Sequence, residues 1–513
     1  MIHSRVGRQM LLLLAGALII SGCSDPVPAT SAPSLQVPPT AAPISGPLPE
    51  PAGGGSAPPC TVSVEPGWDV ADVAARQPEG AVICFGPGLY SVPHTIEPKA
   101  SQTLRGSEGT VLTGEIPVEG WRKDGEHWAV SGYLPPDYEK VGQCEDTSGN
   151  PCQVAETFFL DGRPLRRVMS RDAVDDATFF ADYSANVIYL GRNPRGQAAT
   201  LARTRTAIGS TAPNVSVEKL TIRGFANLAQ KGAVLVGGRD WTVRNSVITA
   251  NHGVGIMIVR AENARITGNT ITANGQMGIG QYRSVGGRID NNRIIANNTA
   301  EFWRADWESG GIKVTKSSST IANNEVSDNL GVGIWIDEAG DGVSILSNDI
   351  QGNAACGVRY EISRNGRIIG NTIKENALAL KRGAGTNVFT GAGITVNTSS
   401  DVTIEDNSVS GNLNGIGVQA RPRGDGPWGE YVLDKISVKG NQIDLRAPVT
   451  ATTGYVESKT LLTPPSAGSV TFQGNRYHLT DPVSARFNLK DGIVDFRAWQ
   501  AAGNDIDGTV TGS

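Results

Sequence analysis

The stretch NSVITANHGVGIMIVRAENARITGNTITANGQMGIGQYR, residues 245–283, contains two successive copies of one sequence unit. In each copy an Asn is followed after one residue by Val or Ile, a second Asn comes five or six residues later, and a Gly-led aliphatic segment follows. The first Asn recurs eight times, and most of the spacings are 23 or 24 residues. The eight positions are Asn245, Asn269, Asn292, Asn324, Asn348, Asn371, Asn407 and Asn441. A fixed period of this size predicts stacked coils, each of which buries its apolar face against its neighbours.

The residue types in the repeat select one kind of solenoid. Helical solenoids need apolar residues at a period of 3.6, and leucine-rich repeats need a Leu-x-x-Leu-x-Leu frame; the repeat has neither. Short β-branched segments separated by Asn and Gly are typical of strands joined by turns. We therefore predict an all-β fold, a single-stranded, right-handed parallel β-helix, with Asn side chains stacked in ladders at the turns.

The N-terminus has the pattern of a bacterial export signal. Arg5 and Arg8 precede an apolar run that is too short to remain as a membrane span, and the run ends in Ile-Ser-Gly-Cys at Cys23. This ending resembles a lipobox, so we expect Cys23 to carry a lipid anchor that faces the cell envelope or the exterior. A plain secretory signal with an incidental Cys is the alternative. Residues 24–59 are rich in Pro, Ala and Ser and predict an extended, disordered linker.

Five cysteines follow the predicted anchor. In an oxidising compartment the spacing suggests Cys60–Cys84 and Cys144–Cys152 as local disulfides, with Cys356 left as a buried thiol. The formal net charge is −5 and there is no basic stripe, which argues against nucleic acid as a partner.

The pattern divides the chain beyond the linker into four parts. Residues 60–117 are expected to form the first coils, and residues 118–205 interrupt the repeat with many aromatic residues, which predicts an inserted antiparallel β module. Coils resume over 206–445. Residues 446–513 are expected to form last coils and a cap, because an open end of the solenoid would expose sheet edges.

Two coils are longer than the others. The extra residues lie approximately at Thr299–Ser309 and Leu378–Thr390. Long loops on a solenoid usually gather on one face and take part in binding, although they are also tolerated as mere surface additions.

The Gly-led segments align on their first Gly. The second and fourth positions are mostly Ile or Val and therefore point inward, so the third and fifth positions point outward. The third positions are Met257, Gly280, Lys313, Trp335, Arg359, Thr395 and Gly417. The fifth positions are Val259, Tyr282, Thr315, Asp337, Glu361, Asn397 and Gln419.

This alignment places two carboxyl groups on neighbouring coils. Asp337 and Glu361 would lie about 4.8 Å apart at the backbone. Two stacked carboxylates repel each other, so the pKa of one should rise while that of the other stays low. A retaining glycoside hydrolase needs such a pair, with its carboxyl groups roughly 5–5.5 Å apart. A charge ladder without a function is the competing interpretation.

Further candidates surround this pair. Trp335 could offer a flat surface to a sugar ring, and Trp303 and Trp307 in the first long loop could add a wall. Lys313 and Arg359 could bind hydroxyl groups or a substrate carboxylate.

Three other residues are weaker candidates. Tyr282 and Glu338 are expected at the rim of the site. His252 stands in an Asn-His-Gly turn and is interpreted as a turn residue; no metal or other cofactor is expected in the hydrolase.

The residues 333–373, GIWIDEAGDGVSILSNDIQGNAACGVRYEISRNGRIIGNTI, resemble the active-site coils of β-helix glycoside hydrolases of the β-xylosidase type, which have a pectate-lyase-like fold. The resemblance implies that Asp337 is the nucleophile and Glu361 the acid/base. The segment FFLDGRPLRRVMSRDAVDDATFFAD, residues 158–182, is similar to the β-sandwich inserted in that group. Glu338 departs from the pattern, because Trp often follows the family's Asp.

Three functions remain open at this stage. The first is a retaining glycosidase, in which Arg359 keeps Asp337 ionised while Glu361 holds a proton. The second is a polysaccharide lyase or uronate epimerase, in which Lys313 or Arg359 removes a proton and the two carboxylates bind Ca²⁺. The third is a glycan-binding surface lipoprotein without catalysis.

Overall fold

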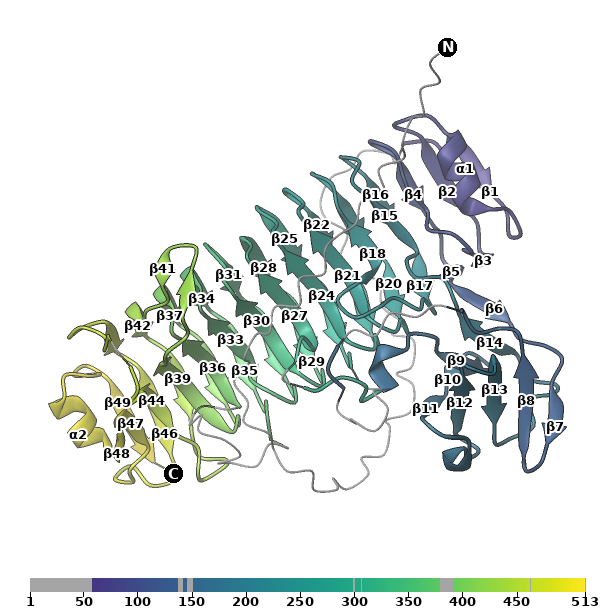
Figure 1. Cartoon of the computed structure of the whole chain (residues 1–513). Coiled ribbons are helices and arrows are strands. Elements are labelled where there is room, and N and C mark those ends of the chain that lie inside the picture. The colour runs from purple at the N-terminus through teal and green to yellow at the C-terminus, as the bar shows by residue number, and fades with distance from the viewer. Residues whose placement is uncertain are drawn as a thin grey trace, which may run out of the picture.

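Three long sheets run along the molecule in the computed structural model (Figure 1). The structure describes residues 58–136, 142–144, 151–298, 300–305, 307–378, 389, 391–461 and 463–512. Each coil gives one strand to each sheet: β19 (Thr242–Arg244) belongs to sheet A, β20 (Val247–Thr249) to sheet B and β21 (Val254–Val259) to sheet C. Within the described residues sheets A and B have 13 strands each and sheet C has 12. The all-β fold with parallel coils is confirmed.

Sheet C has the register that the alignment of Gly-led segments predicts. Its central strands are β21, β24 (Met277–Tyr282), β27 (Gly310–Thr315), β30 (Val332–Asp337), β33 (Val358–Glu361), β36 (Ala392–Asn397) and β39 (Asn414–Ala420). Ile256 pairs with Ile279, and Ile312 with Ile334, and each of these side chains is at most 1% exposed. Stacked aliphatic side chains therefore form the core, and the alternate residues lie on the outer face of sheet C.

Two Asn ladders connect the coils. The first lies between sheets A and B and joins Asn269, Asn292, Asn324, Asn348, Asn371, Asn407, Asn441 and Asn475. The second lies between sheets B and C and joins Asn251, Asn274, Asn297, Asn329, Asn353, Asn376 and Asn412. In both, each Nδ2 donates to the Oδ1 of the next coil, and the buried amides are thereby satisfied.

The first predicted repeat position is out of register by one residue. Ser246, not Asn245, aligns with Asn269, and the Ser246 backbone N–H donates to Asn269 Oδ1 at 3.0 Å. Asn245 is exposed with a φ of 52°, and Val247 is 37% exposed, while Ile248 points inward. The ladder also extends one step beyond the predicted series, to Asn475, which donates to Asp505 at 2.9 Å.

Replacement of Asn348 by Ala is expected to lower the free energy of unfolding by about 3 kcal/mol, because unpaired buried groups cost about 1–3 kcal/mol each. The side chain bonds Asn371 Oδ1 and Ile321 O, both at 3.0 Å, and accepts from Asn324. Chemical denaturation of Asn348→Ala measures the loss. Asn245→Gly is the matched control, since Asn245 is outside the ladder; an equal loss in both variants would contradict the structural role of the ladder.

The interruption of the repeat forms a separate set of strands beside the helix (Figure 1). It leaves sheet B after β5 (Thr110–Thr113) and returns to sheet C at β15 (Ile208–Ser210). The strands form a four-stranded and a five-stranded sheet with antiparallel pairs, except that β11 (Arg166–Val168) pairs in parallel with β12 (Thr178–Asp182). Phe158, Phe179, Ile188 and Leu201 belong to its own core. The bounds of the remaining strands are β6 (Glu115–Pro117), β7 (Arg122–Asp124), β8 (His127–Ser131), β9 (Phe158–Leu160), β10 (Arg163–Pro164), β13 (Val187–Leu190) and β14 (Ala199–Ala202).

Short helices lie near both ends of the described chain. Helix α1 (Val70–Arg76) has Asp69 as its N-cap. At the other end β48 (Gly492–Val494) pairs antiparallel with β47 (Phe487–Lys490), and helix α2 (Phe496–Ala501) follows. Trp499 of α2 is fully buried, so this end covers the last coils.

Two disulfides join Cys60 to Cys84 and Cys144 to Cys152, and Cys356 is a buried free thiol. The predicted signal, Cys23 and nearly all of the linker lie outside the described residues. Within the described part, no helix has the length and apolar character needed to span a membrane.

Candidate active site

The outer face of sheet C carries the predicted columns. In the register of neighbouring strands, Lys313 is opposite Trp335 and Trp335 is opposite Arg359. In the second column Thr315 is opposite Asp337. Glu361 pairs with Asn397 on the next coil. The predicted neighbours Asp337 and Glu361 therefore lie on adjacent coils.

Loops at both edges of sheet C contribute side chains to this face, since Glu308 forms an ion pair with Lys313 and Arg423 with Glu361. The inserted strands and residues 300–305 and 307–309 leave the helix between sheets B and C. The hairpin of β40 (Asp425–Gly426) and β41 (Gly429–Glu430) leaves it between sheets C and A (Figure 1). Most of 378–390 lies outside the described residues, but Phe389 is fully buried and occupies the space that a side chain at Gly417 would need.

Asp337 shares one lysine with a second acid. Lys313 Nζ lies 2.9 Å from Asp337 Oδ2 and also forms an ion pair with Glu308. Asp337 Oδ1 is buried and has no hydrogen-bond partner in the described part of the chain. Burial raises the pKa of Asp337 to about 6, and the negative charges of Glu361 and Glu308 add to this rise while Lys313 opposes it. Asp337 is thus a carboxyl group that accepts a proton readily.

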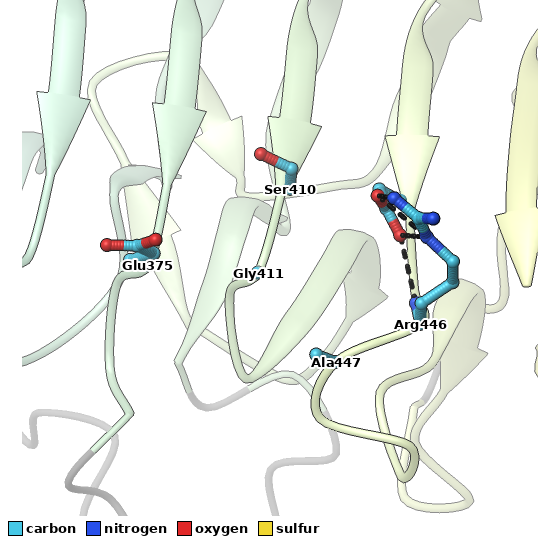
Figure 2. A pocket seen from close by; sticks show the side chains of 6 residues that line it. Glu375, Ser410, Gly411, Arg446 and Ala447 are labelled. Atoms are coloured by element: carbon cyan, nitrogen blue, oxygen red, sulfur yellow. Dashed lines mark hydrogen bonds and ion pairs between the residues drawn. The ribbon is translucent and has the colours of Figure 1, made fainter. Parts of the chain in front are cut away.

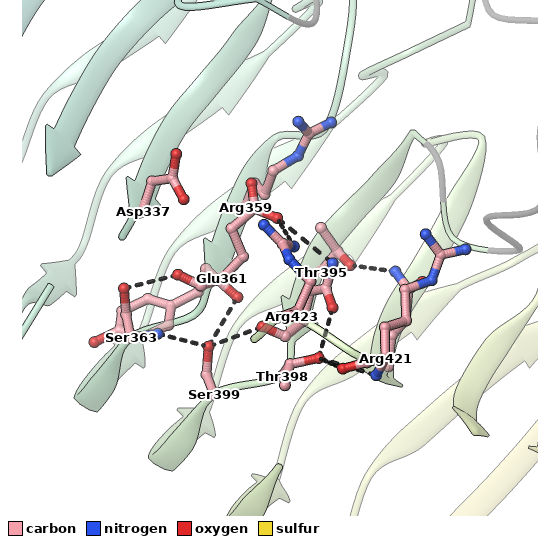
Figure 3. A network of polar contacts seen from close by, with 12 residues as sticks. Asp337, Arg359, Glu361, Ser363, Thr395, Thr398, Ser399, Arg421 and Arg423 are labelled. Carbon is pink, nitrogen blue, oxygen red and sulfur yellow. Dashed lines mark hydrogen bonds and ion pairs between the residues drawn. The ribbon is translucent and has the colours of Figure 1, made fainter. Parts of the chain in front are cut away.

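Glu361 has the opposite surroundings (Figure 3). Arg423 Nη1 lies 2.7 Å from Glu361 Oε2, Trp335 Nε1–H donates to Oε1 at 2.8 Å, and Asn397 Nδ2 lies 3.5 Å from Oε2. Burial would raise the pKa of Glu361, but Arg423 and Arg359 hold it below its ordinary value. Glu361 is therefore the carboxylate that stays ionised.

The charges differ from the expectation in two respects: the pKa of Asp337 is raised and that of Glu361 lowered, the reverse of the expected pattern, and the neighbouring cations are exchanged. Arg359 was expected to keep Asp337 ionised, but it acts on Glu361, and Lys313 forms the ion pair with Asp337. Lys313 Nζ lies 3.6 Å and Arg359 Cζ 4.8 Å from the ring centre of Trp335. The Trp335 N–H donates to Glu361 and thereby positions that carboxylate. Because the Trp335 side chain is only 5% exposed and its ring contacts both cations, little of its surface is left for a sugar ring.

The two loop tryptophans are expected to form a wall for substrate, but the structure buries Trp303. Trp303 is 1% exposed, pairs with Cys144 in an isolated β-bridge and packs in one cluster with Cys144 and Cys152. Trp307 is half-buried and stacks on Trp303, with ring centres 5.9 Å apart. Trp303 therefore fixes the loop beneath the inserted strands and offers no open face.

His252 has more contacts than a simple turn residue. It is 3% exposed, and its Nε2 lies 2.9 Å from the backbone oxygen of Cys152. Its ring packs against Phe302 and Trp303. Burial lowers the pKa of His252 to about 4, so it is neutral at pH 7 and joins the insertion to the long loop.

Tyr282 and Glu338 differ in their relation to the paired carboxyl groups, because Glu338 directly follows Asp337 in the sequence. Tyr282 is two coils before Asp337 in the same column, half-buried, with Arg283 Cζ 5.2 Å from its ring centre. Glu338 has a left-handed φ of 45° and forms an ion pair with Lys316 at 3.3 Å.

Several residues at the site were not singled out from the sequence. They are Glu308 in the first long loop and Arg423 and Tyr431 around the hairpin. Burial and the charges of Glu338 and Asp337 raise the pKa of Tyr431, which places its hydroxyl group near both acids. The signal was the spacing of 34 residues from Asn407 to Asn441, which predicts a third long coil.

The residues at this site do not suit a calcium ion. Ca²⁺ takes six to eight oxygen ligands. Here Lys313 occupies one oxygen of Asp337 and Arg423 one oxygen of Glu361. In the described ranges no three His, Cys, Asp or Glu residues group closely enough to hold a metal ion.

An open hollow of about 340 Å³ lies elsewhere, at the turn after sheet B (Figure 2). It is lined by Glu375, Ser410, Gly411, Asp444, Arg446 and Ala447. Arg446 Nη2 lies 2.7 Å from Asp444 Oδ2, so these two charges are already paired. Of the two acidic residues in this lining, Asp444 is the one that Arg446 neutralises, and Glu375 comes from a different coil.

The comparisons with known proteins agree with this fold. A family model described as a right-handed beta helix region matches residues 232–409. Among solved structures, the chain is similar to XylC in complex with xylose, with 15% sequence identity, 80% of each chain covered and a TM-score of 0.61. No curated protein sequence matches. The chain therefore has the fold of a right-handed parallel β-helix.

Two weaker structural likenesses are to epimerases. The A-module of the Azotobacter vinelandii mannuronan C-5 epimerase AlgE6 has 13% identity, a TM-score of 0.49, and coverage of 86% of this chain and 92% of that one. The periplasmic alginate epimerase AlgG has 12% identity, a TM-score of 0.40, and coverage of 82% and 84%. At these scores neither bears on the chemistry of the present site.

Proposed function

We propose that the protein is a carbohydrate-active enzyme, a retaining glycoside hydrolase that uses Asp337 and Glu361. The observation that carries this proposal is a pair of buried carboxyl groups on adjacent coils with opposite charge environments. Double displacement needs one ionised carboxylate as nucleophile and one protonated carboxyl group as acid/base. The similarity to XylC in complex with xylose gives a pentose glycoside as the first substrate to try.

The charges favour a division of roles opposite to the one that the sequence resemblance implies. Glu361, held ionised by Arg423 and Arg359, is suited to attack the anomeric carbon. Asp337, whose pKa is raised and whose Oδ1 has no partner among the described residues, is suited to give a proton to the leaving oxygen and then to activate water. The resemblance assigns Asp337 as nucleophile and Glu361 as acid/base, and variants of the two residues decide between the assignments.

The lyase or epimerase alternative has less support from the geometry. Removal of the C5 proton by Lys313 requires a neutral amine. Burial would lower the pKa of Lys313, but Asp337 and Glu308 raise it above its ordinary value. Lys313 is therefore a poor base.

A panel of xylans, arabinans and uronate polymers tests the proposed reaction class. The purified protein is incubated with each polymer, and reducing ends and near-ultraviolet absorbance are read together, with and without chelator. New reducing ends without absorbance, unaffected by chelator, support the hydrolase. Absorbance that chelator abolishes indicates a lyase, and saturable binding without product indicates a binding protein.

The activity is expected to follow a bell-shaped pH profile. Glu361 must be ionised, and its pKa lies below the ordinary 4.5, so the acid limb of the profile is expected at a pH below 4.5. Asp337 must be protonated, so kcat/KM declines as pH rises through about 6. The two limbs belong to the coupled pair and not to single residues. A profile of kcat/KM from pH 3 to 9 checks this; full activity maintained at pH 8 would contradict it.

We also propose export and a lipid anchor at Cys23. The lipobox-like Ile-Ser-Gly-Cys supports the anchor, and two disulfides agree with an oxidising compartment outside the cytoplasm. An anchored enzyme of this kind would act on glycans in the envelope or beside the cell.

A further inference from the structure

Lys313 is the only link between Glu308 and Asp337 that the described contacts show. The lysine side chain is 6% exposed and forms ion pairs with both acids, on two different elements of the fold. Glu308 comes from the long loop and Asp337 from β30. One positive charge is thus shared by two carboxyl groups, and Glu361 adds a third negative charge nearby.

The position of Glu308 is held by the surrounding loop. Its backbone has a φ of 49°, a left-handed conformation that persists for an ordinary residue only where the surroundings impose it. Ser309 Oγ donates to Arg304 O at 2.9 Å, and Asn298 Nδ2 donates to Trp303 O at 2.9 Å. Trp303 in turn packs beneath the Cys144–Cys152 disulfide, so the insertion fixes the loop that presents Glu308.

We propose that Glu308 is a positioning residue that divides the charge of Lys313 and thereby keeps a proton on Asp337 at the working pH. This inference rests on the proposed hydrolase. Without Glu308, the full charge of Lys313 would act on Asp337 and favour its ionised form. Glu308 acts through Lys313, so it is not itself a catalytic residue.

The charged and titratable groups around Asp337 come from four elements. Lys313 lies on β27, Glu361 on β33, Glu308 in the long loop, and Tyr431 beside the hairpin. Glu308 is the member of this set whose charge can be removed without altering either carboxyl group or Lys313 itself. Gln at this position keeps an oxygen that can accept from Lys313 and loses only the charge.

The test is the pH profile of Glu308→Gln. The alkaline limb of kcat/KM is expected to move from about 6 to lower pH by about one unit, the size of shift that a nearby charge produces. At pH 7 the activity then falls about tenfold, while the maximum at low pH changes by less than about twofold. Glu308→Asp retains the charge, so its alkaline limb should lie at the same pH as in the parent. Glu301→Gln, at an exposed position in the same loop, should also leave the limb at that pH.

A uniform loss at every pH, with the alkaline limb at the same pH as in the parent, would overturn the proposal and give Glu308 a merely structural role.

A second measurement, of stability, does not need a substrate. Because the pKa of Asp337 is raised in the folded protein, its contribution to stability is lost as pH rises from about 4 to about 6. The difference in Tm between Asp337→Asn and the parent, followed over pH, reports this window.

In the Glu308→Gln background, the pH range over which the stability contribution of Asp337 is lost should move to lower pH, even if no glycan is cleaved. A shifted window without any turnover would support the role of Glu308 and reject the hydrolase. An unshifted window in an active hydrolase would reject only the role of Glu308. The two failures are therefore distinguishable.

Discussion

Glu361→Gln is expected to lower kcat by at least about 10⁴-fold on every glycoside, as loss of a nucleophile does in other enzymes. A neutral amide cannot attack the anomeric carbon, whatever the leaving group. The variant also leaves Arg423, now 2.7 Å from Glu361, without its counter-charge. Steady-state kinetics on aryl and natural glycosides measure the loss, and Glu405→Gln, half-buried at the end of a strand of sheet A, is the matched control.

Chemical rescue separates a nucleophile from any other role. In Glu361→Gly, azide should restore turnover and give a glycosyl azide whose anomeric configuration is opposite to that of the substrate. Rescue of Asp337→Gly with the inverted azide product, and of Glu361→Gly with the azide of retained configuration, would give the roles that the sequence resemblance implies. Circular dichroism of each variant checks that it remains folded.

Asp337→Asn is expected to lower kcat/KM by about 10²–10⁴-fold on glycosides with poor leaving groups, the usual contribution of general acid catalysis. Aryl glycosides with acidic phenols need little protonation, so their first step should be far less affected. The alkaline limb near pH 6 should also disappear, because the group that titrates there is gone. A plot of log(kcat/KM) against leaving-group pKa measures the effect.

The slope of that plot distinguishes an acid/base residue from a nucleophile. A steep slope in Asp337→Asn beside a shallow slope in the parent indicates an acid/base residue. An equal loss on all leaving groups, with azide rescue to the inverted product, would show that Asp337 is the nucleophile.

The repeat made the fold and the two outward columns predictable from the sequence. Inward Ile and Val side chains at alternate positions fix the register of sheet C, since a slip of one residue would turn them outward. For this reason Asp337 and Glu361 could be placed on adjacent coils. The same reasoning failed at Asn245, because Asn-Ser-Val fits the pattern in two registers and only the burial of Ile248 chooses between them.

The residues that set the charge of each carboxyl group could not be predicted in the same way. Arg423 and Glu308 come from long loops, whose course is determined by contacts between distant segments and not by the repeat. The packing of Trp303 under Cys144 and Cys152 is such a contact. The alignment also gives only the column of Lys313 and Arg359, whereas the direction of each long side chain decides which acid it neutralises.

The most direct test is to trap the covalent intermediate. The protein is incubated with an activated 2-deoxy-2-fluoro glycoside of whichever sugar the polymer panel releases, and the labelled peptide is sequenced by tandem mass spectrometry. The account predicts one added sugar per molecule, attached to Glu361. A label on Asp337 would contradict the division of roles. An enzyme that hydrolyses the parent glycoside with inversion and never takes up a label would contradict the double displacement.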